Sequence, residues 1–139
     1  MERFIAETSF HVRYAETDAM RIVHHSNYIV WFEEGRSHYM RARGTSYADF
    51  ERDGFFMAVT EVHVRYMKPV YYDERVTVRA WLEQARSRSM VFAYEILNSA
   101  NEICVTGQTH HICMTQDGRV ARIPPTWLAW MTSRENSAR

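Results

Sequence analysis

One aspartate in this sequence has the setting that acyl-transfer chemistry requires. Asp18 lies in a short polar connection, AETDAMRIVHH, between a predicted strand and a predicted helix. Backbone N–H groups at the start of a helix lack intrahelical partners and carry the positive end of the helix dipole, so they can hold a developing oxyanion. A carboxylate beside such donors can act on a carbonyl as general base or as nucleophile. An aspartate here can equally do no more than cap the turn.

Two pairs of histidines are the residues that could bind a metal ion. They are His24-His25 and His110-His111. Neighbouring side chains on a strand point to opposite faces, so neither pair is expected to chelate an ion from one regular element. The sequence therefore predicts no metal site.

A basic turn between two predicted strands is a candidate for phosphate binding. It consists of Arg86, Ser87, Arg88 and Ser89. Arginines and hydroxyls together suit the phosphates of coenzyme A, although the same residues could simply form a solvated turn. On the predicted helix, Glu34 is a second candidate carboxylate, and a solvated or ion-paired helix face is the alternative.

The long helix that must position Asp18 is predicted from hydrophobic periodicity. Its apolar face consists of Tyr28, Phe32, Gly35, Tyr39 and Ala42, which recur at spacings of three and four. The helix is expected over Asn27–Arg43, with Ser26 or Asn27 as its cap and Gly44 as its stop. Gly35 inside the apolar face predicts that the backbone lies close to a neighbouring layer.

Strands surround this helix in the sequence. Alternation predicts one strand over residues 4–14, with Phe10, Val12 and Tyr14 on one face, and four more around residues 62–66, 76–82, 90–96 and 102–115. The last run changes phase, which predicts a bulge near Gly107. Short helices are expected over residues 47–53, with Ser46 and Asp49 as a capping pair, and after Pro124-Pro125.

These elements predict an α+β domain. Consecutive strands joined by short turns are expected to pair antiparallel, and the one long helix packs on a face of that sheet. With 139 residues, of which 46% are hydrophobic, the chain is expected to form a single domain over residues 1–139. Its core covers about residues 4–132, and residues 133–139 form a polar tail.

Charge and cysteine content indicate which partners and which cellular compartment to expect. The 17 Lys and Arg residues balance the 17 Asp and Glu residues, so no nucleic-acid partner is expected. Cys104 and Cys113 form no disulfide scaffold and are expected to be buried thiols. Because the sequence has no secretory leader and no apolar stretch of membrane-spanning length, we expect a cytoplasmic protein without a membrane partner.

The stretch VRYAETDAMRIVHHSNYIVWFEEGR, residues 12–36, resembles the signature of the 4-hydroxybenzoyl-CoA thioesterase-like branch of the hotdog superfamily. Members of that branch begin with a strand and a T-D motif, continue through a short loop to an N-Y dipeptide, and then form a long central helix. The segment VRYMKPVYYDERVTV, residues 64–78, is similar to the second strand pair of the family. The resemblance covers about residues 4–125 and implies the hotdog fold, in which an antiparallel β-sheet wraps around that helix.

The resemblance also implies roles for single residues. Asp18 matches the catalytic carboxylate, and His25 stands where a backbone N–H polarises the thioester carbonyl. Asn27 and Tyr28 match the N-Y pair that shapes the pocket, and the turn of residues 86–89 matches the hairpin that holds the nucleotide end of coenzyme A. Arg21 departs from the pattern, because the family has a glycine three residues after the aspartate. A glycine there permits an unusual backbone conformation.

The function implied is hydrolysis of an acyl-CoA thioester to a free acid and CoA. No cofactor is expected, because coenzyme A is part of the substrate. The alternatives are a non-catalytic acyl- or pantetheine-binding module on the same fold and a thioesterase acting on acyl carrier protein. Phe55, Phe56 and Tyr66 are candidates for lining the acyl pocket.

The resemblance further implies a homodimer or a homotetramer. A sheet with one covering helix leaves its edges exposed, and exposed edges favour pairing with a second chain. Asp18 of one chain is then expected to face the strand of residues 60–70 of the other. On that strand, His63 and Arg65 are expected to look toward the interface or the second face of the sheet.

Overall fold

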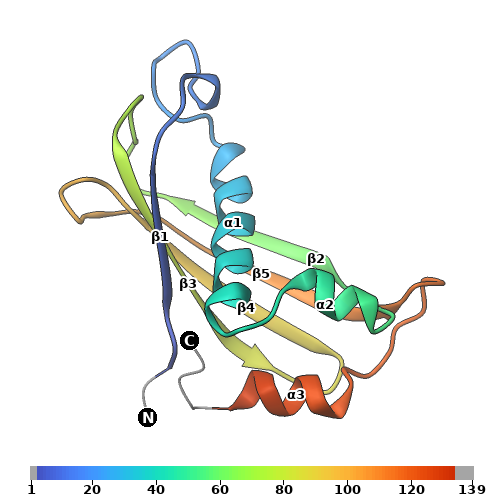
Figure 1. Ribbon diagram of the computed structural model, residues 1–139. Helices are drawn as coiled ribbons and strands as arrows, with labels where there is room; N and C mark the ends of the chain where they lie inside the picture. The colour runs from blue at the N-terminus through green and yellow to red at the C-terminus, as the bar shows by residue number, and fades with distance from the viewer. Residues whose placement is uncertain (1–2, 134–139) are drawn as a thin grey trace.

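Five strands form one antiparallel sheet in the order β1-β3-β4-β5-β2 (Figure 1). The strands are β1 (Ala6–His11), β2 (Phe55–Tyr66), β3 (Arg75–Ala85), β4 (Ser89–Leu97) and β5 (Ile103–Thr115). The helices are α1 (Asn27–Ala42), α2 (Tyr47–Arg52) and α3 (Pro125–Thr132), and a 3-10 turn η1 spans Tyr14–Glu16. The computed structural model describes residues 3–133, so most of the predicted polar tail lies outside the described residues. Helix α1 lies across one face of the sheet, which confirms the α+β prediction.

The strand order differs from the predicted pairing of consecutive strands. β3, β4 and β5 do pair in succession, but β2 pairs with β5, with Phe55 opposite Thr115 and Tyr66 opposite Val105. The chain then crosses to β3, which lies beside β1. Alternation indicates which face of a strand is buried but not which strand lies next to it. As a result β1 and β2 are the two edges of the sheet.

Two glycines allow α1 to approach the sheet closely. A Cβ added at Gly35 would lie 2.7 Å from Cγ1 of Val78, so the predicted close approach of the helix backbone is confirmed. A Cβ added at Gly107 would overlap the ring of Phe32, which stacks on Tyr94 with centroids 4.4 Å apart. Both contacts fix the height of α1 above the sheet, because packed interiors leave no room for an extra methyl group.

The bulge predicted near Gly107 lies elsewhere. Odd-numbered residues of β5 from Val105 to Cys113 face α1 without interruption, so the strand keeps one phase. The register slips at Cys104, since Ile96 pairs with Val105 whereas Leu97 pairs with Ile103. The apparent change of phase arose because apolar residues on β5 occupy both faces of the sheet.

A chain of buried hydrogen bonds lies beneath α1. Arg36 Nη1 donates to the Tyr94 hydroxyl at 3.0 Å, and Tyr94 Oη lies 2.6 Å from Thr109 Oγ1, which lies 2.7 Å from His111 Nε2. Burial, together with the charge of Arg36, lowers the pKa of His111 to about 3, so its ring stays neutral. His110 points to the opposite face, as the alternation predicted.

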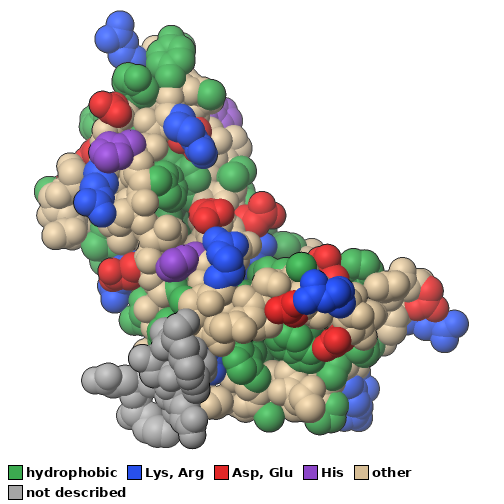
Figure 2. All heavy atoms as spheres, in the orientation of Figure 1, with side chains coloured by type: hydrophobic (Ala, Val, Ile, Leu, Met, Phe, Trp, Pro, Cys, Tyr) green, Lys and Arg blue, Asp and Glu red, His purple; other side chains and the backbone are tan. Residues whose placement is uncertain are grey.

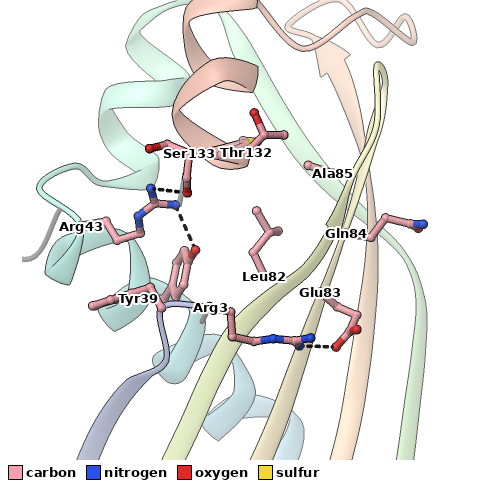
Figure 3. A pocket seen from close by; sticks show the side chains of 11 residues that line it. Arg3, Tyr39, Arg43, Leu82, Glu83, Gln84, Ala85, Thr132 and Ser133 are labelled. Carbon is pink, nitrogen blue, oxygen red and sulfur yellow. Dashed lines mark hydrogen bonds and ion pairs between the residues drawn. The ribbon is translucent and has the colours of Figure 1, made fainter. Parts of the chain in front are cut away.

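Arg43 fastens the C-terminal helix to α1, as Figure 3 shows. Its guanidinium donates to the Tyr39 hydroxyl at 3.1 Å and to the Trp130 carbonyl at 3.0 Å, and lies 4.4 Å from the centre of a Trp130 ring. A small cavity of about 210 Å³ opens beside it, bordered also by Arg3 and Glu83. These contacts give Arg43 a structural role, because its charge is held between the buried ring of Tyr39 and the half-buried ring of Trp130.

The surface carries charges of both signs. On the face shown in Figure 2, basic and acidic side chains are interspersed and do not gather into a patch of one sign. This distribution agrees with the balanced composition. Among the described residues, no helix has the length and apolar character needed to cross a membrane.

Candidate active site

The connection between β1 and α1 is organised around one buried acid, Glu16. Its carboxylate accepts hydrogen bonds from Trp31 Nε1 at 2.8 Å, from Arg13 N at 2.8 Å and from Arg13 Nη2 at 2.7 Å. Burial raises the pKa of Glu16, but the hydrogen bonds from Arg13 and Trp31 outweigh it and hold the pKa below its ordinary value. Glu16 therefore ties the loop to α1 as a carboxylate.

The backbone of Glu16 completes this attachment. Its carbonyl accepts the backbone N–H of His24 at 2.9 Å and the side-chain amide of Asn27 at 3.0 Å. Further along, Val23 N donates to Val70 O at 2.9 Å, which fixes the loop to the segment before β3. Glu16 was not among the predicted site residues, because a glutamate beside a turn is normally exposed.

Asp18 begins a tight turn inside this loop. Its Oδ1 accepts the backbone N–H of Met20 at 2.8 Å, its N–H donates to Ile22 O at 2.9 Å, and its carbonyl accepts Arg21 N at 2.9 Å. The described residues donate no hydrogen bond to Oδ2. The capping alternative is therefore confirmed for one oxygen, while the other oxygen is available for chemistry.

Arg21 takes the backbone conformation that the expected glycine would take. Its φ is +65°, in the left-handed region that favours glycine. The turn after Asp18 thus keeps its shape although the residue differs, and the arginine side chain is exposed.

This strain predicts the effect of restoring the glycine. We expect Arg21→Gly to raise the free energy of unfolding by about 0.5 kcal/mol, because the left-handed penalty of about 1–2 kcal/mol exceeds the extra chain entropy of about 0.5–1 kcal/mol. Arg21→Val should lower it by about 1 kcal/mol, since a β-branched residue fits this region worst. Urea unfolding of the three proteins measures the differences. An Arg21→Gly protein clearly less stable than the wild type would contradict this explanation.

A groove of about 450 Å³ opens beside Asp18, between its loop, the start of α1 and the end of β2. It is lined by Asp18, Met20, Ile22, Val23, His25, Tyr28, Tyr66, Met67, Lys68 and Pro69. The Tyr66 hydroxyl donates to His25 O at 3.0 Å and so connects β2 to the start of α1. Burial raises the pKa of Tyr28 to about 12, so its phenol stays protonated.

The backbone N–H of His25 lies beside this groove, just before α1. The N–H of His24 is used by Glu16 O, and the N–H of Asn27 by His24 O at 2.9 Å. The described residues offer no acceptor to the N–H of His25. Because this N–H lies at the positive end of the helix dipole, it can donate to an oxygen that gains negative charge.

The predicted cap of α1 is wrong in its details. Ser26 holds the N-cap position, but its hydroxyl lies 2.8 Å from His24 Nδ1 and caps no backbone N–H of the helix. The Asn27 side chain donates to Glu16 O and does not line the groove, whereas Tyr28 does. A histidine two residues before the cap competes for the serine hydroxyl, which a capping rule does not consider.

The histidine pair in this loop also differs from expectation. His24 and His25 lie outside any strand, so they do not point to opposite faces, and their ring centroids are 4.1 Å apart. The argument against joint chelation from strand alternation therefore does not apply to them. His24 Nδ1 is engaged with Ser26, and His25 packs on Tyr66 with centroids 6.4 Å apart.

The turn of residues 86–89 joins β3 to β4 and lies at the other end of the sheet from the loop between β1 and α1 (Figure 1). His11, at the end of β1, pairs with Arg75 at the start of β3, so the Asp18 loop is near that start. An 11-residue strand then separates the two, a span of roughly 35 Å at about 3.3 Å per residue. One chain therefore does not bring this turn to Asp18.

Four further candidates are also placed by the structure. Tyr66 lines the groove, but Phe55 and Phe56 lie at the far end of β2. Glu34 is exposed, pairs with Arg41 at 3.2 Å and lies outside the groove, so the ion-paired alternative holds for it.

Comparison with known proteins shows the family to which this fold belongs. Residues 12–131 match the Thioesterase-like superfamily, and the chain belongs to that family. YneP of Bacillus subtilis (strain 168), named as a candidate acyl-CoA thioesterase, is 36% identical over 113 residues, which are 81% of this chain and 82% of YneP.

Two other proteins extend the comparison. The acyl-CoA thioester hydrolase YbgC of Escherichia coli O157:H7 is 24% identical over 103 residues, which are 74% of this chain and 77% of YbgC. The crystal structure of DHNA-CoA thioesterase from Staphylococcus aureus is 38% identical, superposes with a TM-score of 0.86, and covers 91% of this chain and 87% of its own. These similarities confirm the hotdog fold and the family resemblance.

Proposed function

We propose that this chain hydrolyses acyl-CoA thioesters in the groove beside Asp18. One observation carries this proposal. The groove holds both the Asp18 carboxylate, whose Oδ2 accepts no hydrogen bond from the described residues, and the backbone N–H of His25 at the start of α1. Membership of the Thioesterase-like superfamily supports it, as do the names of YbgC and of the S. aureus enzyme.

The reaction needs a thioester carbonyl placed between these two groups. The His25 N–H would donate to the carbonyl oxygen and stabilise the charge that develops there. Asp18, held by the Met20 N–H through Oδ1, would present Oδ2 to the carbonyl carbon or to a water molecule. Thiolate leaves as the C–S bond breaks and takes a proton, so that CoA and a free acid are the products.

Asp18 has two chemically complete routes to these products. As a nucleophile, it forms a mixed anhydride that water then cleaves. As a general base, it accepts a proton from the water that attacks the carbonyl. After a single turnover in oxygen-labelled water, labelled oxygen in the Asp18 side chain identifies the anhydride route, in which water attacks the Asp18 carboxyl carbon.

The lining of the groove favours an aromatic acyl group. The rings of His25, Tyr28 and Tyr66 border it, and aromatic rings pack favourably against one another. The names of the S. aureus enzyme and of a Thermosynechococcus vestitus relative, 1,4-dihydroxy-2-naphthoyl-CoA hydrolase, point the same way. Thiol release from short, long and aromatic acyl-CoAs tests this preference, and equal rates for all three would contradict it.

Coenzyme A is the expected carrier of the acyl group. The alternative carrier, acyl carrier protein, is acidic in character, and the mixed charges of Figure 2 offer it no basic patch on that face. Turnover of the same acyl group on the two carriers distinguishes them. A faster reaction with the protein carrier would favour the alternative.

A homodimer joined through β2 would complete the site. β2 is a 12-residue edge strand, and an antiparallel pair of such edges brings the Tyr66 end of one protomer beside the Phe55 end of the other. The turn of residues 86–89 lies at that Phe55 end, because Arg88 O accepts the N–H of Cys113 on β5. The phosphates of CoA would thus be held by the protomer that does not supply Asp18.

Light scattering and subunit mixing test this assembly. We expect a dimer or tetramer at micromolar concentration. Asp18→Asn protein and Arg86→Ala/Arg88→Ala protein, each nearly inactive, should regain about a quarter of wild-type activity when their subunits are mixed, because half the dimers are mixed and each has one intact site. An active monomer, or no recovery between subunits that exchange, would contradict the shared site.

We also place the protein in the cytoplasm. Cys104 and Cys113 are both buried free thiols, on β5. Unpaired thiols of this kind are typical of a reducing compartment.

A further inference from the structure

Three side chains converge on the sheet face opposite α1, where β2 and β5 run side by side. Glu61 and His63 are two residues apart on β2, so both point to that face. His110 lies on β5 directly opposite Glu61. One ligand atom from each lies within 4.8 Å of the others, and the described part of the chain holds no second group of this kind.

Contacts within the group hold the three side chains together. His63 Nε2 lies 2.8 Å from Glu61 Oε1, and the ring centroids of His63 and His110 are 5.4 Å apart. The bulge at Thr60 shifts the register of β2 at this point, and Thr60 Oγ1 donates to His110 O at 3.2 Å.

We propose that Glu61, His63 and His110 bind one divalent transition-metal ion, with Zn²⁺ as the expected ion. Two imidazoles and one carboxylate form a donor set that zinc takes at about 2.0–2.2 Å, with a fourth position open to water. Ligand atoms around such an ion are about 3.4 Å apart, so rotation of exposed side chains closes the site without moving the strands. Paired strands supply a rigid frame for it.

The sequence did not predict this site, because Glu61 and His63 on β2 lie far from His110 in the sequence. The histidine neighbours in sequence, His110 and His111, point to opposite faces, whereas the register of β2 and β5 brings His110 to Glu61. Edge pairing through β2 uses backbone groups and leaves side chains on their faces. The site therefore remains available in the proposed dimer.

Titration of the metal-free full chain with ZnCl₂, followed by calorimetry, tests the proposal. We expect one Zn²⁺ per chain, and His63→Ala and His110→Ala should each weaken binding at least about tenfold. Glu61→Gln should weaken it in the same direction. His11→Ala removes an exposed histidine of β1 outside the group and serves as the matched control, with wild-type affinity.

A second readout separates a formed site from loose surface binding. Zn²⁺ should raise the Tm of the wild type but not that of His110→Ala, while circular dichroism without metal shows both proteins folded. The proposal is overturned if less than half an equivalent binds, if either histidine substitution leaves the affinity unchanged, or if His11→Ala loses as much affinity. None of these measurements uses an acyl-CoA, so the outcome is independent of the proposed hydrolysis.

Discussion

Asp18→Asn is expected to lower kcat for acyl-CoA hydrolysis about a thousandfold, the size of effect that a positioned catalytic carboxylate has. An asparagine keeps the Oδ1 that accepts the Met20 N–H at 2.8 Å, so the turn and the groove should keep their shape. The affinity for CoA should therefore change less than about twofold, because only the group that acts on the carbonyl is lost.

Steady-state thiol release measures kcat, and calorimetric titration with CoA measures affinity. Asp117→Asn is a matched control, because Asp117 lies in the exposed turn after β5, away from the groove. It should behave as the wild type. If Asp18→Asn kept more than a tenth of the wild-type kcat, Asp18 would not be the catalytic carboxylate.

Glu16→Ala should cause the largest loss of stability of the single substitutions considered, about 3 kcal/mol. It leaves Trp31 Nε1, on a side chain that is 1% exposed, without its acceptor and releases Arg13. Glu16→Gln keeps one oxygen for Trp31 and should cost about 1–1.5 kcal/mol. Urea unfolding at pH 7 gives both values.

The lowered pKa of Glu16 also predicts how the free energy of unfolding depends on pH. The folded-state pKa of Glu16 lies below its ordinary value of 4.5, so its contribution is fully present above that value and is lost as the pH falls through the folded-state pKa. The free energy of unfolding of the wild type should therefore fall more steeply below about pH 4.5 than that of Glu16→Gln. Equal slopes would show that the Glu16 carboxylate contributes nothing to acid stability.

Local patterns predicted the elements but not their neighbours. The apolar face of α1, the close approach at Gly35 and the strands β3 to β5 follow from periodicity and residue size, which act over a few residues. The pairing of β2 with β5 depends on contacts far apart in sequence, so alternation left it open. The bulge was predicted near Gly107 and not at Cys104, because β5 carries apolar residues on both faces.

In the candidate site, too, local features were predicted and contacts between distant residues were not. Asp18 was predicted as a site residue from its position before a helix, and the family resemblance added His25 and Tyr28. All three line one groove. The burial of Glu16 could not be predicted, since it requires Trp31 and Arg13 to converge in three dimensions. The separation of residues 86–89 from Asp18 follows from the direction of β3, which depends on its pairing with β1.

The central claim is that the chain hydrolyses acyl-CoA thioesters. The measurement that tests it most directly is the release of free CoA thiol and free acid when the purified full chain is mixed with an excess of acyl-CoA. We predict one thiol and one acid for each acyl-CoA consumed, over many turnovers per chain. Tight binding of acyl-CoA that stays intact, with no thiol released from any acyl class, would contradict the claim and identify a binding module instead.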